Sequence, residues 1–174
     1  MLSRAVKALR KGETPRLEEP FEALTEIRLG EPALLPADYC PDVEERLTLY
    51  KRLADCDSVE AIDALYEEFI DRFGLLPPPA RTLLETHRLR LICERVQLAK
   101  VDATATRIRL EFAQNAPVDP AAVLVLIQQN PRTHKLETPT RIAQTGDFPD
   151  VPTRLHAIHT LLQQVLETHT LPQP

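Results

Sequence analysis

The sequence has few of the residues that build nucleotide-binding or base-stacking sites. Of its 174 residues, 5% are aromatic and none is tryptophan, so a platform for stacking single-stranded bases is poorly supplied. The four glycines include no GxxxxGK[ST] or GxGxxG segment, which argues against a phosphate-cradling loop. The net charge of −5 is opposite in sign to the excess expected of a general binder of phosphate backbones.

The three cysteines and the hydropathy pattern also exclude several classes. Cys40, Cys56 and Cys93 are odd in number and widely spaced, so they predict neither a disulfide framework nor a CxxC metal half-site. No apolar run approaches the ~20 residues needed to cross a bilayer, and the N-terminus has no apolar signal core. We therefore expect a cytoplasmic protein without membrane contact.

What is present is ordinary for a globular protein, with 43% hydrophobic and 27% charged residues. The length allows one domain with a sizeable core, which we place at residues 21–174. Residues 1–20 contain a short helical stripe (Leu2, Ala5, Val6, Leu9) with a basic opposite face. The stripe indicates either the end of a preceding region plus a linker, or a frayed helix packed on this domain.

The periodicity predicts an α+β fold in which helices cluster around a small, mostly antiparallel sheet. Helices come first, and the helix over 41–54 is expected to bury Val43, Leu47, Tyr50 and Ala54. Asp57 is expected to open the second helix, and the three prolines at 77–79 to form a connector. The predicted helices cover 41–54, 57–74, 81–96, 119–127 and 150–165, and the predicted strands cover 26–29, 96–101, 105–113, 134–136 and 141–143.

No constellation for catalysis stands out. HExxH and GxSxG segments are absent, and Tyr39-Cys40-Pro41 has no nearby histidine to activate the thiol. His156 and His159 lie three apart on one predicted helix, as metal ligands can, but no cysteine or carboxylate accompanies them at ligand spacing. We expect a non-enzymatic chain with no cofactor and no metal.

Acidic residues dominate the segment from Asp42 to Asp71, where ten acids face three bases. On the second helix, Glu60, Glu67, Glu68 and Asp71 are expected opposite the stripe that contains Phe69 and Phe73. Such a face is either simply solvated or a docking surface for a basic partner, where charge adds specificity and association rate.

The segment from Thr25 to Leu76 also carries a family resemblance. It contains a glutamate-led strand, then a pattern of the form lP..Y.pd...Rl.lYkrl, and later EFIDRFG followed by Pro77. This order resembles the C-terminal domain of the bacterial transcription-repair coupling factors, the Mfd family with its TRCF domain, and the resemblance runs from about Leu2 onward. The residues that match are Glu26, Leu35, Pro36, Tyr39, Pro41, Asp42, Arg46, Leu47, Tyr50, Lys51, Arg52 and the stretch 68–74.

The resemblance implies a regulatory role. Members of that family are ATP-driven DNA translocases that displace stalled RNA polymerase and recruit UvrA. Their C-terminal domain docks on a UvrB-like module of the same protein, covers the UvrA-binding surface and restrains the motor. The family's ATPase motor lies upstream of this segment, so we expect no motor activity here.

The charge pattern and the implied role together predict a partner-binding site on the second helix. We place the contact at Glu68, Asp71 and Arg72, with Glu60, Glu67 and Glu45 as flanking charge. Its predicted partner is the UvrB-like module, with UvrA and stalled RNA polymerase affected indirectly and DNA bound through other domains.

A nucleic-acid-binding accessory module is the alternative function. The stretch 81–109 has seven bases against three acids, and Arg107 and Arg109 on a strand could meet phosphates. The bases are Arg81, Arg88, Arg90, Arg95, Lys100, Arg107 and Arg109. The other explanation is that these bases neutralise the acidic helices within the same chain.

Overall fold

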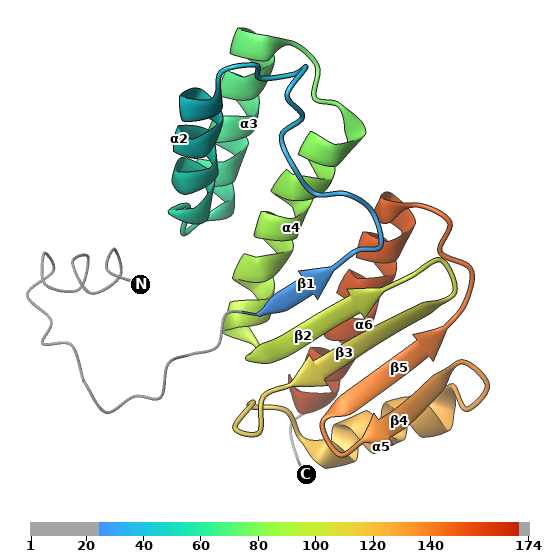
Figure 1. Cartoon of the computed structure of the whole chain (residues 1–174). Coiled ribbons are helices and arrows are strands. Elements are labelled where there is room, and N and C mark those ends of the chain that lie inside the picture. Colours follow the sequence, from blue (N-terminus) through green and yellow to red (C-terminus); the bar gives the residue numbers. More distant parts are fainter. Residues whose placement is uncertain (1–24, 171–174) are drawn as a thin grey trace, which may run out of the picture.

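The computed structural model describes residues 25–170, with side chains described through residue 165, and it confirms the α+β class (Figure 1). The element predicted within residues 1–20, and with it the proposed boundary at residue 20, lies outside this range. The helices are α2 (Val43–Ala54), α3 (Val59–Phe73), α4 (Pro78–Arg95), α5 (Pro120–Gln129) and α6 (Val151–Thr170). The strands are β1 (Glu26–Arg28), β2 (Leu98–Ala103), β3 (Arg107–Phe112), β4 (His134–Thr138) and β5 (Arg141–Thr145).

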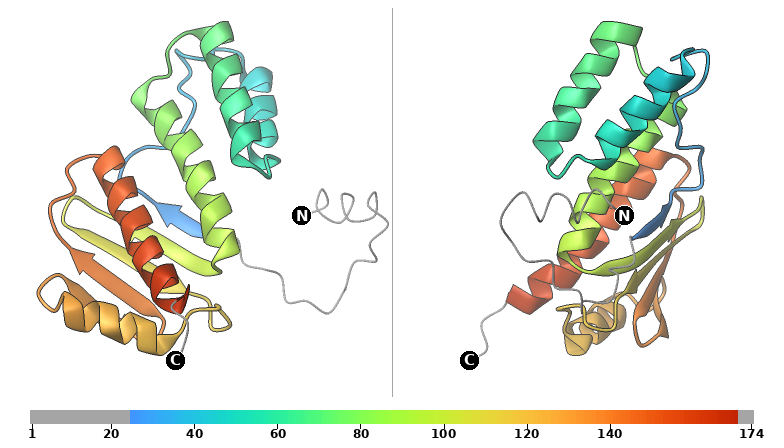
Figure 2. Two further views of the ribbon diagram at one scale, coloured as in Figure 1. Left: turned by 180° about the vertical axis from the view of Figure 1, so that it is seen from behind. Right: turned by 60° about the vertical axis from the view of Figure 1, so that its left-hand side comes forward.

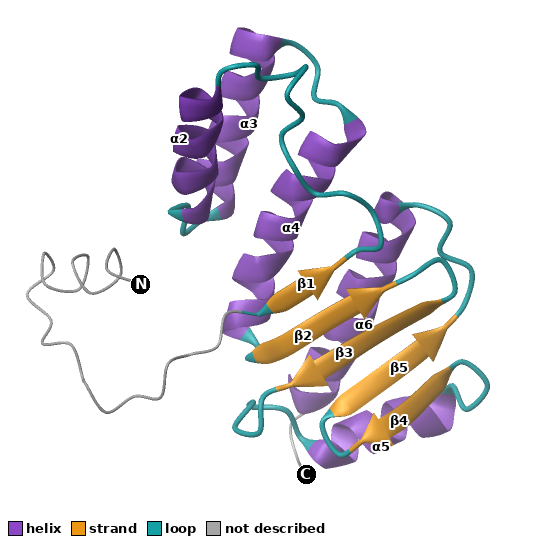
Figure 3. Ribbon diagram, in the orientation of Figure 1, coloured by secondary structure: helices purple, strands orange, loops and turns teal. Residues whose placement is uncertain are grey.

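The five strands form one sheet in the order β1-β2-β3-β5-β4 (Figure 3). β1 runs parallel to β2, while the other three pairings are antiparallel, so the sheet is mostly antiparallel as predicted. The alternation in RIRLEF explains the central strand: Ile108, Leu110 and Phe112 are buried on one face, and the residues between them point to the other.

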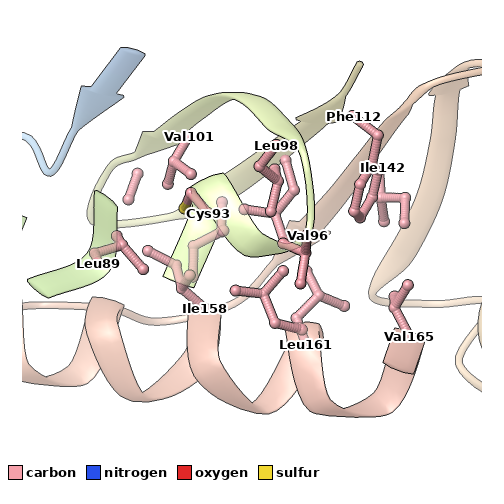
Figure 4. Close-up of a cluster of buried hydrophobic side chains, with 14 of the residues drawn as sticks. Leu89, Cys93, Val96, Leu98, Val101, Phe112, Ile142, Ile158, Leu161 and Val165 are labelled. Carbon is pink, nitrogen blue, oxygen red and sulfur yellow. The ribbon is translucent and has the colours of Figure 1, made fainter. Parts of the chain in front are cut away.

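Two hydrophobic cores share one helix. The sheet core is built from one face of the sheet together with α4, α5 and α6, and includes Leu89, Cys93 and Ile158 (Figure 4). The second core joins α2, α3 and the first half of α4, around Phe69 and Leu84. The view from behind shows α4 and α6 crossing the back of the sheet (Figure 2), and no helix of residues 25–170 covers the front.

The predicted buried stripe of α2 is wrong for Val43, Leu47 and Ala54, whereas Tyr50 packs against the second core. Val43 and Leu47 are 58% and 62% exposed, whereas Leu49 and Leu53 are almost fully buried. The helix carries apolar residues on two faces, and the segment before it decides which is buried. Arg46 donates from Nη1 to the carbonyl oxygen of Cys40 at 2.6 Å, which ties this segment to the helix.

Two predicted helix starts also need correction. Ser58, not Asp57, caps α3, since its hydroxyl accepts from the Ala61 N–H. Pro78 and Pro79 belong to the first turn of α4 rather than to a connector. Proline is tolerated there because the backbone N–H groups of a helix's first turn have no acceptor within the helix, so the N–H that proline lacks is not missed. Within residues 25–170, no helix combines the length and apolar character needed to cross a membrane.

Candidate docking surface

The candidate surface lies on the helical hairpin formed by α2 and α3. Asp42 and Ser58 cap the two helices with side-chain oxygens, and Gly74 ends α3 at φ +83°, a backbone angle that favours glycine. The Gly74 N–H donates to the Ile70 carbonyl oxygen at 2.9 Å. The family-like EFIDRFG segment is therefore the last turns of α3 and its terminating glycine.

Four charged residues join the two helices in what we call the ion-pair network: Arg52 and Glu45 on α2, Glu68 and Arg72 on α3. Arg52 binds Glu68 with both terminal nitrogens, at 2.7 and 2.6 Å. Arg72 contacts the same carboxylate at 3.0 Å and also pairs with Glu45. Bidentate geometry of this kind is the strongest form of an arginine–carboxylate pair.

The pairing of Arg52 with Glu68 changes the acid–base properties of both residues. The hydrogen bonds from Arg52 lower the pKa of Glu68, and the same contact raises the pKa of Arg52. Both shifts favour the charged forms, so Arg52 and Glu68 stay ionised near neutral pH. Arg72 also lies over the Phe73 ring, with its guanidinium carbon 5.0 Å from the ring centroid.

The structure therefore divides the six predicted contact residues into two groups. Glu45, Glu68 and Arg72 are brought together in the ion-pair network, and Glu68 lies on the flank toward α2 rather than opposite the buried stripe. Glu60, Glu67 and Asp71 lie on the exposed side of α3, and we call these three the acidic outer face. Within the described chain, no ion pair engages the side chains of this outer face.

Two tyrosines of the family-like pattern hold the hairpin to the preceding loop. The Tyr39 hydroxyl lies 3.1 Å from the Phe69 carbonyl oxygen and 2.9 Å from that of Gly74, so it caps the end of α3. The Tyr50 hydroxyl accepts from the Leu35 N–H at 2.7 Å. These residues of the pattern maintain the fold, and the acidic outer face is displayed on the frame they build.

Sequence reasoning missed Arg52 as a member of the site. The position of Arg52 in the sequence could have indicated the pairing. Arg52 lies three residues before the short turn between α2 and α3, and an antiparallel helical hairpin brings residues near the end of its first helix close to the second helix. The exposed pair Val43 and Leu47 was also missed, since both were assigned to the core.

The remaining candidates for chemistry are structural or dispersed. Burial lowers the pKa of His87 to about 4, with nearby Arg90 adding to the shift, and burial raises the pKa of the Cys93 thiol to about 12. His156 and His159 are exposed on α6, and the described residues contain no group of three or more potential metal ligands. These properties favour a neutral, half-buried imidazole at His87 and an unreactive thiol in the core at Cys93.

The basic stretch 81–109 is split between two parts of the fold. Arg88 on α4 pairs with Asp63 of α3 and with Glu85. Arg107 and Arg109 lie instead on β3, on the face of the sheet opposite α4, α5 and α6. Arg88 thus neutralises part of the acidic charge of α3, whereas Arg107 and Arg109 belong to a separate surface.

Comparison with known proteins gives one consistent result. The family model of the TRCF domain matches residues 29–123. The chain is 37% identical to the transcription-repair-coupling factor of Escherichia coli over 167 residues and 39% identical to that of Haemophilus influenzae over 165 residues. These alignments cover 96% and 95% of the chain but 14% of each relative, so the chain spans about a seventh of their length.

A solved structure agrees at the level of the fold. The crystal structure of a C-terminal domain of transcription-repair coupling factor superposes with a TM-score of 0.64 at 20% identity, covering 83% of this chain and 96% of that one. The family match includes the loop with Tyr39, both helices of the ion-pair network and β3. The chain therefore belongs to the TRCF-domain family.

Proposed function

We propose that this chain is a non-catalytic, autoinhibitory docking domain of a transcription-repair coupling factor. It docks on the UvrB-like module of the same protein, masks the surface that binds UvrA and restrains the DNA translocase motor. It thereby keeps the protein inactive in transcription-coupled nucleotide excision repair until stalled RNA polymerase is engaged.

The observation that carries this proposal is the acidic outer face of α3. Glu60, Glu67 and Asp71 are exposed on a helix that the ion-pair network fixes to its neighbour. A rigid row of carboxylates is complementary to a basic surface, and its ordering costs little entropy on binding. Asp71 is the centre of the proposed contact, and Glu68 and Arg72 border it.

A polar contact suits a switch. Because the domain and its target are tethered in one protein, a high effective concentration compensates for a modest interface. The contact must also open when polymerase binding favours the released state, which a large apolar interface would resist. The partners proposed for the parent protein are UvrA and RNA polymerase indirectly, DNA through other domains, and no membrane, in the cytoplasm.

The decisive experiment reverses charge on the outer face. Because Glu68 holds Arg52 and Arg72, its reversal would disturb the hairpin, so the sharper variant is Asp71→Lys in the full-length protein. We expect UvrA binding without polymerase to rise about fivefold to tenfold, since one charge reversal at a contact is worth on the order of 1 kcal/mol.

The matched control is Asp147→Lys, an equal charge change at an exposed residue in the loop between β5 and α6. Binding of this chain to its own UvrB-like module in trans should weaken for Asp71→Lys and stay unchanged for Asp147→Lys. If Asp71→Lys leaves both measurements at the resting level while its urea midpoint is unaltered, the outer-face assignment is wrong.

A further inference from the structure

A second surface, separate from the hairpin, lies on the front of the sheet. Cross-strand pairing places charged side chains on this open face, because directly opposed residues point to the same side. Arg28, Asp102 and Arg109 form one row across β1, β2 and β3. The basic residues of the face are Arg28, Lys100, Arg107, Arg109, Lys135 and Arg141.

Charge is distributed unevenly over the chain, so its net charge does not describe this face. Residues 25–76 contain thirteen acids and five bases, whereas residues 77–165 contain eight acids and eleven bases. The open face itself has six bases against four acids: Glu26, Asp102, Glu111 and Glu137. Its positive excess is local and lies on the sheet, whereas the acidic outer face lies on the α2–α3 hairpin.

Close ion pairs balance one end of the open face. Arg141 meets Glu111 at 2.7 Å, and Glu26 pairs with Arg28 at 2.6 Å and with Lys100 at 3.4 Å. The other end has looser contacts. Arg107 comes no closer to Glu137 than 3.9 Å, and Lys135 takes part in no ion pair within the described chain.

A hollow of about 540 Å³ lies at this less balanced end. Arg107 and Arg109, two positions apart on β3, form one wall, and Asp102 lies beside Arg109. Three hydroxyl side chains and a glycine complete the lining: Thr104, Thr106, Thr145 and Gly146. Arginines with adjacent hydroxyls are the side chains that recognise phosphate oxygens.

The present partners of the two arginines are exchangeable. Arg109 contacts Glu137 at 3.2 Å and Asp102 at 3.7 Å, and all these side chains are between about a quarter and a half exposed. Exposed pairs of this kind contribute little stability, so a ligand with more negative charge can replace Glu137 at little cost. The Thr106 hydroxyl forms no hydrogen bond within the described residues and is available as a donor.

We propose that this hollow binds a phosphate group of a nucleic-acid backbone through Arg107, Arg109 and Thr106. A smaller hollow lined by Lys100, Asp102, Arg109, Glu111 and Arg141 continues along the face. A second phosphate there has to replace Glu111 or Asp102 as the partner of the bases, because Arg141 now pairs with Glu111 and Arg109 with Asp102. Phosphates joined in a chain can use both positions, and a single inorganic ion cannot. Among the described residues, this face has no aromatic side chain on which a base could stack, so the contact reads the backbone and not the base sequence.

The test uses the full chain and a fluorescein-labelled 20-base-pair duplex of arbitrary sequence, with binding followed by anisotropy between about 25 and 200 mM salt. Arg107→Gln and Arg109→Gln should each weaken binding about threefold to tenfold and reduce the salt slope by about one. Glu137→Gln should strengthen binding about threefold, because it removes the carboxylate that competes with the phosphate.

Each variant has a control on the same face. Arg28→Gln and Glu26→Gln make equal charge changes at β1, away from the hollow, and should have less than half the effect. Equal effects at Arg28 and Arg107, or unchanged binding in Glu137→Gln, would overturn the site. The urea midpoint of each variant shows whether the fold is intact.

A parallel titration with inorganic phosphate, followed by amide chemical shifts, identifies the source of the anion. Shifts at Thr106, Arg107 and Thr145 at millimolar phosphate, with much tighter binding of the duplex, support the proposal. Duplex binding no tighter than phosphate binding would mean that the hollow holds a small anion and would overturn the nucleic-acid assignment. Because the hollow lies on the sheet and the acidic outer face lies on the α2–α3 hairpin, this result is independent of the docking proposal.

Discussion

Arg154 donates a hydrogen bond from Nη1 to the carbonyl oxygen of Leu29, 2.7 Å away and 125 positions earlier in the chain. The same guanidinium donates to the carbonyl oxygens of Phe148 and Pro149, at 2.9 and 3.2 Å. Arg154 is only 4% exposed, and the carboxylate of Glu31 lies 3.6 Å from Nη1. A buried cation here fastens the segment after β1 to the start of α6.

Removing this guanidinium should destabilise the domain strongly. Arg154→Met keeps much of the side-chain volume but leaves buried carbonyls without donors, so we expect a loss of about 2–4 kcal/mol in the free energy of unfolding. Urea denaturation measures the loss. Arg28→Met, which removes an exposed arginine, should change stability by less than about 0.5 kcal/mol, and a similar loss in both variants would contradict the assigned role.

The α+β class and most elements were predictable because their signals are local. Strict alternation in RIRLEF marked β3, and Asp119-Pro120 marked the start of α5. The inward face of α2 was not predictable, since Leu47 and Leu49 are equally apolar and the choice depends on the loop that Arg46 and Tyr50 bind. Arg154 was missed for a related reason: its partners are backbone carbonyls far away in sequence.

The candidate site was predictable only in part. The exposure of Glu60, Glu67 and Asp71 follows from helical periodicity around Phe69. The pairing of Glu68 with Arg52 does not, because it depends on the register between two helices. Whether the acidic outer face contacts a partner stays a prediction.

The Tyr39 hydroxyl should contribute measurably to the hairpin. Tyr39→Phe removes the donor to the carbonyl oxygens of Phe69 and Gly74 and should cost about 0.5–1.5 kcal/mol of unfolding free energy. Tyr66→Phe is the control, since no hydrogen bond engages the Tyr66 hydroxyl within residues 25–170, and it should be nearly neutral. Equal losses in the two variants would mean that the hydrogen bonds of the Tyr39 hydroxyl add no stability of their own.

His87 should make stability depend on pH. Its folded-state pKa of about 4 lies below the ordinary value of 6.5, so the unfolded chain binds this proton more readily. The folded state should therefore lose stability as pH falls from about 6.5 toward 4, by at most about 3 kcal/mol from this residue. Urea midpoints of the wild type and His87→Gln between pH 7 and 4 isolate the effect, because other groups titrate in both, and parallel curves would rule it out.

The ion-pair network should couple α2 to α3 in a salt-dependent way. A double-mutant cycle with Arg52→Gln and Glu68→Gln isolates the pair, and we expect a coupling of about 0.5–1 kcal/mol at low salt, because the geometry is bidentate but exposed. Arg28 and Glu26 form a reference pair at 2.6 Å with higher exposure, and their coupling should be near zero. Raising NaCl to about 1 M should remove most of the Arg52–Glu68 coupling, since the Debye length then falls to about 3 Å. A coupling that is equal in the two pairs, or insensitive to salt, would mean that packing between the helices, and not the network, fixes the hairpin on which the acidic outer face is displayed.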